Sequence, residues 1–171
     1  LPPRDRDHPS PVEQAVHQCI PGGSKIPHRS IELERLRLET AKLFQAARQE
    51  SAAGRDADAI ALLRSALALA TLTGDDDRLG DLNAAIGAAF IREDIRQSDT
   101  TQDHLGAAIE TLRAALEITS TTGASADAAT MINLAIAYAR RFRRDGNRTD
   151  LMAAHIELDS AEQEIRKAGD S

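Results

Sequence analysis

The sequence predicts an all-α protein, and three observations carry this prediction. Hydrophobic residues make up 42% of the 171 residues, yet there are only three Phe, one Tyr and no Trp, so the core must be built from small aliphatic side chains. Ala, the best helix former, is abundant, and Leu and Arg follow it closely. Finally, "AIALLRSALALATLTG" (Ala59 to Gly74) returns as "AIETLRAALEITSTTG" (Ala108 to Gly123). A helix used more than once explains all three.

A third copy indicates a structural repeat. The frame Ala-x3-Leu-x2-Ala-x7-Gly begins at Ala59, Ala108 and Ala154. Its Ala and Leu positions fall on one face of a helix with 3.6 residues per turn. Its final glycine stands where a helix should end, because glycine adopts the left-handed C′ conformation without steric cost. We therefore expect helices to stop at Gly74, Gly123 and Gly169.

A second repeated segment lies upstream of the last two copies. "LNAAIGAAF" (Leu82 to Phe90) matches "INLAIAYAR" (Ile132 to Arg140) at a spacing of 50 residues. Each unit is thus predicted to be two helices, and the chain to contain three helix pairs in units of about 30–74, 75–123 and 124–171. The predicted pairs are 30–53 with 56–72, 76–97 with 103–120, and 126–144 with 150–168.

Polar residues mark the expected helix starts. Ser30 precedes "IELE" and reads as an N-cap followed by acids in the first turn. The run Asp75 to Asp77 and the pair Thr149-Asp150 mark two further starts. The three aspartates are interpreted as capping residues and not as a metal cluster, because consecutive helical residues point about 100° apart.

Residues 1–29 do not belong to a repeat. The stretch "LPPRDRDHPSP" is rich in proline and should be extended, and Ser10 to Glu13 then read as a capping box for a short helix over 11–20. A helix this short is marginal alone and should dock to persist. We expect it to pack against the first helix pair or to lie in the groove, either within the chain or on a neighbouring molecule, the second arrangement giving a homodimer.

The paired helices resemble the tetratricopeptide repeat (TPR) family. "NLAIAY" (Asn133 to Tyr138) matches the family's helix A run, and "AIALLRSAL" (Ala59 to Leu67) matches its helix B run. The second and third units are near 50 residues and not 34, like the long units of actinobacterial regulators and of arrays beside caspase-like proteases. In the last helix, His155 and Glu162 replace apolar residues of the earlier copies, which suits the end of a stack; the alternative that His155 is a ligand is less favoured.

The resemblance implies a right-handed superhelix, or α-solenoid, whose concave wall binds a peptide. Asn83 and Asn133 would each grip a peptide unit, since an amide offers both a donor and an acceptor. The family's carboxylate clamp is not predicted, because only Asn83 matches it. An apolar or mixed peptide is the expected ligand. The wall residues implied by the resemblance are Phe44, Gln45, Arg48, Leu79, Leu82, Asn83, Ile86, Phe90, Ile132, Asn133, Ile136 and Arg140. The alternative for its apolar members is packing between neighbouring helices.

Composition narrows the class of protein. A net charge of −6 gives no bulk attraction to nucleic acid or to an anionic membrane. The single Cys19 excludes an internal disulfide framework, and no apolar run could span a bilayer. We therefore expect a cytoplasmic protein, and the preference for Arg over Lys suggests a bacterial source. Because the chain begins at Leu1 and not at Met, we expect it to be processed or excised from a longer product.

No arrangement of residues predicts catalysis. The five histidines show no metal-ligand spacing, Cys19 has only His17 nearby, and "PGGSK" lacks the context of a phosphate loop. We expect no enzyme activity, no metal and no cofactor. The basic run "ARRFRR" (Ala139 to Arg144) is interpreted as a helix end whose cations suit the helix dipole, the alternative being a nucleic-acid or acidic-partner contact.

The expected function is a non-catalytic protein-protein interaction module, a scaffold that binds a peptide or protein partner of unknown identity. The alternative is a regulatory or sensor array excised from a larger signalling protein, such as a transcriptional regulator, an NTPase or a caspase-like protease. The two differ in what lies upstream of Leu1.

Overall fold

The computed structural model describes residues 28–97, 102–122 and 127–169, and every regular element among them is an α-helix. The chain divides into two compact units, 1–32 and 33–171, and the features below belong to the second. The predicted N-terminal helix over 11–20, and any homodimer formed through it, lie outside the described residues. The helices are α2 (His28–Ala52), α3 (Asp56–Thr73), α4 (Asp76–Arg96), α5 (His104–Thr122), α6 (Ala128–Asp145) and α7 (Arg148–Gly169).

The all-α prediction is confirmed for this part of the chain, and each predicted helix agrees with an observed one to within two residues at either end. Turn chemistry explains much of this agreement. Gly74 has φ 63° and ψ 36° and ends α3 in the left-handed conformation. Asp75 then begins α4 by accepting a hydrogen bond of 3.1 Å from the Arg78 N–H.

Three of the predicted helix ends differ or lie outside the described residues. Ser30 is not an N-cap, because α2 already begins at His28. Gly169 is the last residue of α7 and is not among the described glycines with positive φ, so it does not form a left-handed cap. Gly123 lies outside the described residues. The glycine that does end a helix in the third pair is Gly146, with φ 72°, after α6.

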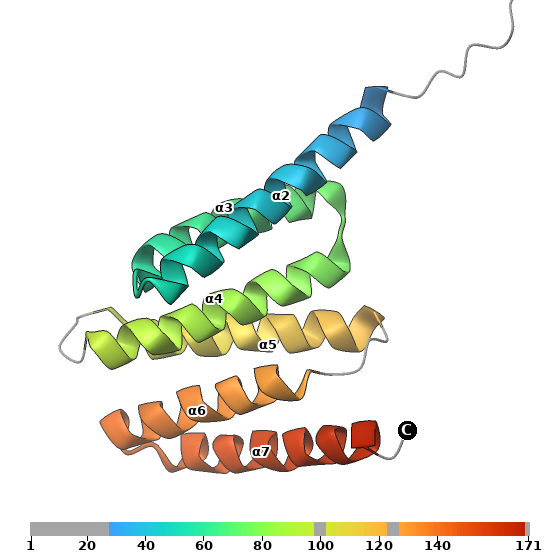
Figure 1. The fold of residues 1–171 in the computed structure, drawn as a ribbon. Coiled ribbons are helices and arrows are strands. Elements are labelled where there is room, and N and C mark those ends of the chain that lie inside the picture. Colours follow the sequence, from blue (N-terminus) through green and yellow to red (C-terminus); the bar gives the residue numbers. More distant parts are fainter. Residues whose placement is uncertain (1–27, 98–101, 123–126, 170–171) are drawn as a thin grey trace, which may run out of the picture. The chain divides into compact units, whose positions relative to one another are not determined.

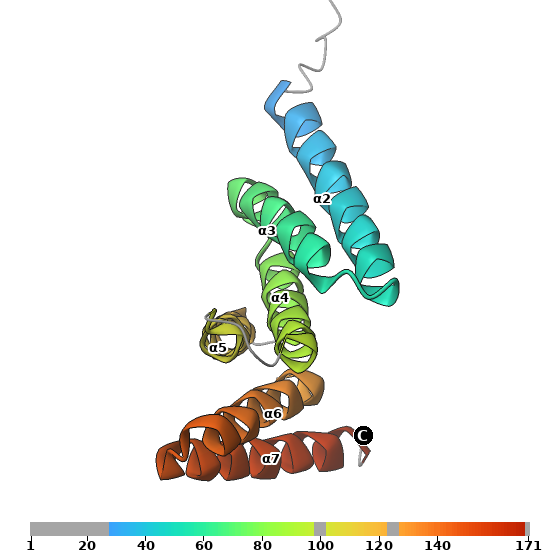
Figure 2. The same cartoon turned by 90° about the vertical axis from the view of Figure 1, so that its left-hand side faces the viewer.

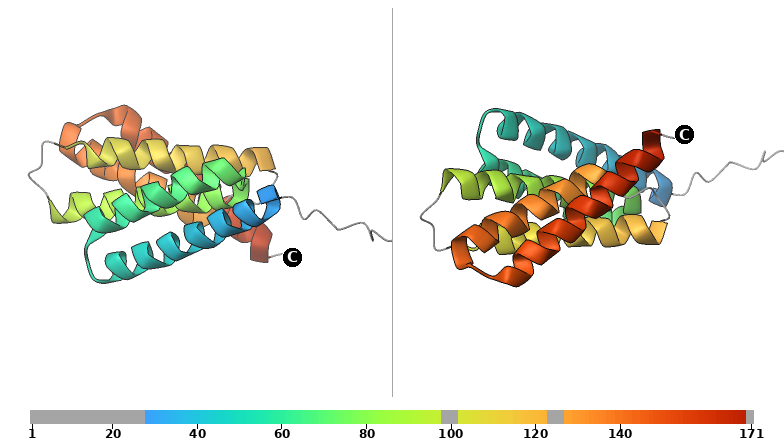
Figure 3. Two further views of the ribbon diagram at one scale, coloured as in Figure 1. Left: turned by 90° about the horizontal axis from the view of Figure 1, so that it is seen from above. Right: turned by 90° about the horizontal axis from the view of Figure 1, so that it is seen from below.

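Consecutive helices pack against one another along the chain (Figures 1 and 2). Helix α4 packs mainly against α5 and also against α3, and α6 packs mainly against α7 and also against α5. The views from above and below show the same neighbours (Figure 3). The side chains buried between them are mostly Ala, Leu and Ile, with Phe90 and Tyr138 as the buried aromatic residues. The expectation of a small aliphatic core is thus met.

The closest approach of α4 and α5 depends on a glycine. A Cβ atom built on Gly87 would lie 2.4 Å from Cγ of Leu112, whose side chain is fully buried. The missing side chain therefore lets α5 pack directly on the backbone of α4. This contact helps to fix which face of α4 is turned into the core.

Candidate binding groove

The burial pattern of α4 repeats in α6 at a spacing of 48 residues. Ile86 and Phe90 of α4 correspond at this spacing to Leu134 and Tyr138 of α6, and all four are buried. The spacing of 50 drawn from the sequence instead pairs buried Ile86 with Ile136, which is 40% exposed. The two spacings differ by two residues, which turn a helix by about 200°. They therefore place nearly opposite faces of α4 in the wall.

The residues of α4 that the sequence assigns to the wall lie mostly inside the protein. Leu82, Ile86 and Phe90 belong to the hydrophobic core, and Asn83 is buried beside them. The Asn83 amide nitrogen donates a hydrogen bond of 2.9 Å to the carbonyl oxygen of Leu79, which is itself half-buried against the core. In this structure these side chains pack helices together and do not line an open surface.

The wall residues of α6 are placed differently. Ile132 and Ile136 are exposed and Asn133 is half-buried. Arg140 reaches across to α4, where its Nη2 lies 2.8 Å from a carboxylate oxygen of Asp94. The exposed isoleucines thus offer apolar surface, whereas Arg140 is already engaged in linking two helices.

On α2, Phe44 is half-buried and both Gln45 and Arg48 are exposed. The guanidinium of Arg78 on α4 stands 5.7 Å from the centre of the Phe44 ring, within the range of a cation–π contact. Phe44 therefore contacts α4 and is still partly exposed.

A groove of about 410 Å³ lies between α2 and α4, with α3 beneath it. Its volume falls within the range of ligand pockets in proteins, roughly 300–1,000 Å³. The groove contains two of the predicted wall residues, Phe44 and Arg48, but Gln45 does not line it. Most of its surface comes from small or apolar side chains. The lining residues are Phe44, Ala47, Arg48, Ser51, Ala52, Leu63, Ala85, Ala88 and Arg92.

The groove residues of α4 were missed by the sequence reasoning, although a signal for them exists. At a spacing of 48, Ala88 corresponds to Ile136 and Arg92 to Arg140. The spacing also aligns the aromatic pair Phe90 and Tyr138. An alignment based on arginines and aromatic residues, and not on asparagines, would have found these residues.

A polar network closes one end of the groove. Arg92 donates a hydrogen bond of 2.9 Å from Nε to Asp56 on α3 and one of 2.6 Å from Nη2 to the Ser51 hydroxyl. The Ser51 hydroxyl in turn donates to Asp56 at 2.7 Å, and Arg96 pairs with the second carboxylate oxygen of Asp56. These contacts connect α2, α3 and α4 and hold the Arg92 side chain in a defined position.

The Asp56 carboxylate is ionised in this network although it is fully buried. Burial by itself would raise the pKa of Asp56. Hydrogen bonds from Ser51 and Arg92, together with the positive charges of Arg92 and Arg96, outweigh this effect, so the pKa lies below its ordinary value. The first turn of α3, where Asp56 stands, also favours negative charge.

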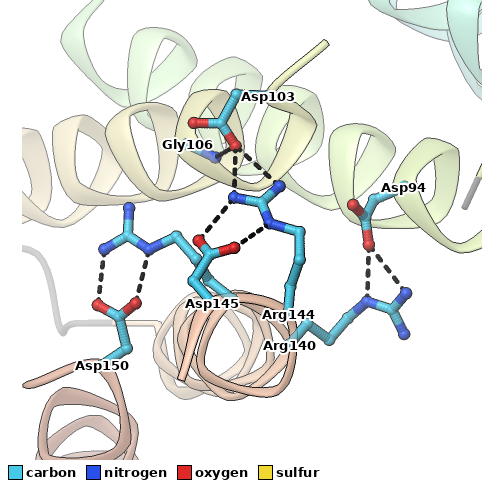
Figure 4. Close-up of polar contacts among 8 residues, drawn as sticks. Asp94, Asp103, Gly106, Arg140, Arg144, Asp145 and Asp150 are labelled. Carbon is cyan, nitrogen blue, oxygen red and sulfur yellow. Dashed lines mark hydrogen bonds and ion pairs between the residues drawn. The ribbon is translucent and has the colours of Figure 1, made fainter. Parts of the chain in front are cut away.

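The basic run at the end of α6 is largely neutralised by carboxylates (Figure 4). Arg144 lies between Asp103 and Asp145, at 3.1 Å and 2.7 Å respectively. Arg141 holds Asp150 through two hydrogen bonds of 2.7 Å and 2.8 Å. The hydrogen bonds from Arg141 lower the pKa of Asp150 despite the opposing effect of burial. Three arginines of the run are thus paired with carboxylates of α4, of α7 and of the segment before α5, whereas Arg143 is exposed.

No metal centre is found in the part of the chain that the structure describes: no three His, Cys, Asp or Glu side chains there are grouped so that they could hold an ion. The aspartates Asp76 and Asp77 begin α4 and, with Asp81 and Asp127, line a hollow of about 230 Å³. None of the helices α2 to α7 combines the length and apolarity that a membrane span requires.

Comparison with known proteins adds no assignment. No protein-family model matches the chain, and no curated protein or solved structure matches it.

Proposed function

We propose that the chain is a non-catalytic protein-interaction module that binds a peptide segment of a partner protein in the groove between α2 and α4. In this proposal the six helices act as three TPR-like pairs in a right-handed superhelix, and the groove is part of its concave wall. The open hollow lined by Phe44, Ala85 and Ala88 is the observation that carries the proposal.

The chemistry of the lining supports a peptide ligand. The alanines leave room above Leu63, and a bulky apolar side chain that fills this room would gain about 1.5–3 kcal/mol on full burial. The polar side chains of the lining, Arg48, Ser51 and Arg92, offer groups that can meet a peptide. Ile132 and Ile136 on α6 offer a second apolar surface at the positions that correspond to Ala84 and Ala88.

A groove-filling substitution tests the proposal. Short random peptides displayed on phage are selected on the full chain, and the affinities of enriched peptides are measured by fluorescence anisotropy. Ala88→Trp should weaken binding at least about tenfold, because the indole occupies the space intended for the ligand. The matched control is Ala68→Trp, on an exposed position of α3 outside the groove, which should bind as the parent chain does. Equal affinity of the two variants would refute the groove as the binding site.

A further inference from the structure

The groove has a charge that differs in sign from that of the chain as a whole. Its lining includes Arg48 and Arg92 and contains no carboxylate. The chain carries a net charge of −6. The groove lining is therefore basic, although the chain as a whole is acidic.

The two arginines are in different states. Arg92 is held in place by Asp56 and Ser51, and its side chain is nevertheless 41% exposed, so it can meet a ligand from a fixed position. The Arg48 side chain is exposed and forms no ion pair or hydrogen bond with any other residue in the described part of the chain. One guanidinium is thus positioned in advance, and the other is free to accept a carboxylate.

We propose that the groove selects an acidic peptide segment in which a bulky apolar side chain stands close to Asp or Glu. This inference rests on the proposed function and specifies the ligand class. The apolar side chain enters the hollow over Ala85 and Ala88, and the carboxylate binds Arg48 and the exposed edge of Arg92. The net charge of the chain opposes this ligand only at long range, where salt screens it over roughly 8 Å.

The selection of displayed peptides on the full chain tests this ligand class directly. The enriched peptides should carry Asp or Glu next to Leu, Ile, Phe or Met. Arg48→Glu should weaken such peptides by about tenfold or more and shift the enrichment towards Lys and Arg. The matched control is Arg35→Glu, which makes the same charge change at an exposed position of α2 outside the groove and should leave affinity and preference unchanged.

The outcomes separate this inference from the proposed function. Enriched peptides that Ala88→Trp blocks but that are neutral or basic would overturn the acidic preference and leave the groove as a binding site. Peptides unaffected by Ala88→Trp would overturn both. A full chain that elutes as a dimer, and becomes monomeric on Ala88→Trp, would assign the groove to a second copy and would also overturn the inference.

Discussion

Helices α4 and α6 share most of their buried positions, yet α4 lines the apolar groove and α6 does not. The difference lies in side-chain size at corresponding positions: α4 carries Ala84 and Ala88 where α6 carries Ile132 and Ile136. Ala88, together with Ala85, lines the space of about 410 Å³ between α4 and α2. On α6 the isoleucines project outward, 36% and 40% exposed. Small residues on one turn of a repeated helix can thus open a hollow without changing the fold.

The largest expected difference in stability is between alanine substitutions at Ile86, on the buried face of α4, and at Ile136, on the exposed face of α6. Ile86 is 1% exposed, so Ile86→Ala should lower the free energy of unfolding by about 2–5 kcal/mol. Ile136→Ala should change it by less than about 1 kcal/mol, because Ile136 is already partly in water. Urea denaturation followed by circular dichroism measures both values. Similar losses for the two variants would mean that these isoleucines are equivalent, as the spacing of 50 residues implies.

The sequence predicted the helices well because their ends depend on local chemistry. Gly74 ends α3 and Asp75 begins α4, both through contacts with residues close in the sequence, and both act as expected. Which face of α4 is turned into the core depends instead on which of its residues contact α5. In an alanine-rich helix several registers look alike, so the shared asparagines Asn83 and Asn133 suggested a spacing two residues too long.

Interactions between distant segments could not be read from spacing at all. Asp56 precedes Arg92 by 36 residues, and only the folded chain shows that a buried carboxylate holds this arginine at the edge of the groove. The basic run on α6 was interpreted correctly as belonging to a helix end. Its partners Asp94 and Asp103, on other segments, gave no signal of their own in the sequence.

The contact between α4 and α5 gives the next largest expected effect. Gly87→Ala would place a Cβ atom 2.4 Å from Leu112, and the buried leucine has little room to move. At Gly80, on the same helix, an added Cβ would have its nearest neighbours at 3.8 Å, which is ordinary contact. Gly80→Ala should therefore gain up to about 1 kcal/mol from helix propensity, whereas Gly87→Ala should lose about 1–2 kcal/mol.

Thermal or urea unfolding of the two glycine variants checks this prediction with the same substitution at both sites. The equivalent position on α6 is Ala135, which is buried and already accommodates a Cβ atom. If Gly87→Ala were as stable as Gly80→Ala, the close approach of α4 and α5 would not be a constraint. The face that α4 presents to the groove would then need another explanation.

The smallest expected effect concerns the ion pairs that hold Arg92 and Arg140. Asp56 is fully buried, whereas Asp94 retains 17% side-chain exposure. At pH 7, Asp56→Asn should cost about 1–2 kcal/mol and Asp94→Asn less than about 1 kcal/mol. The estimate for Asp56 is modest because Arg92 and Arg96 are 41% exposed and can be rehydrated.

Lowering the pH should remove the contribution of Asp56 to the free energy of unfolding. Because its pKa is lowered in the folded chain, the carboxylate stabilises the fold fully above the ordinary value near 3.9 and loses this effect as the pH falls below it. The difference in unfolding free energy between the parent chain and Asp56→Asn should stay constant from pH 7 to about pH 5 and then narrow. A difference that instead narrowed as the pH rose above neutrality would show that the Asp56 carboxylate is not stabilised by its arginines.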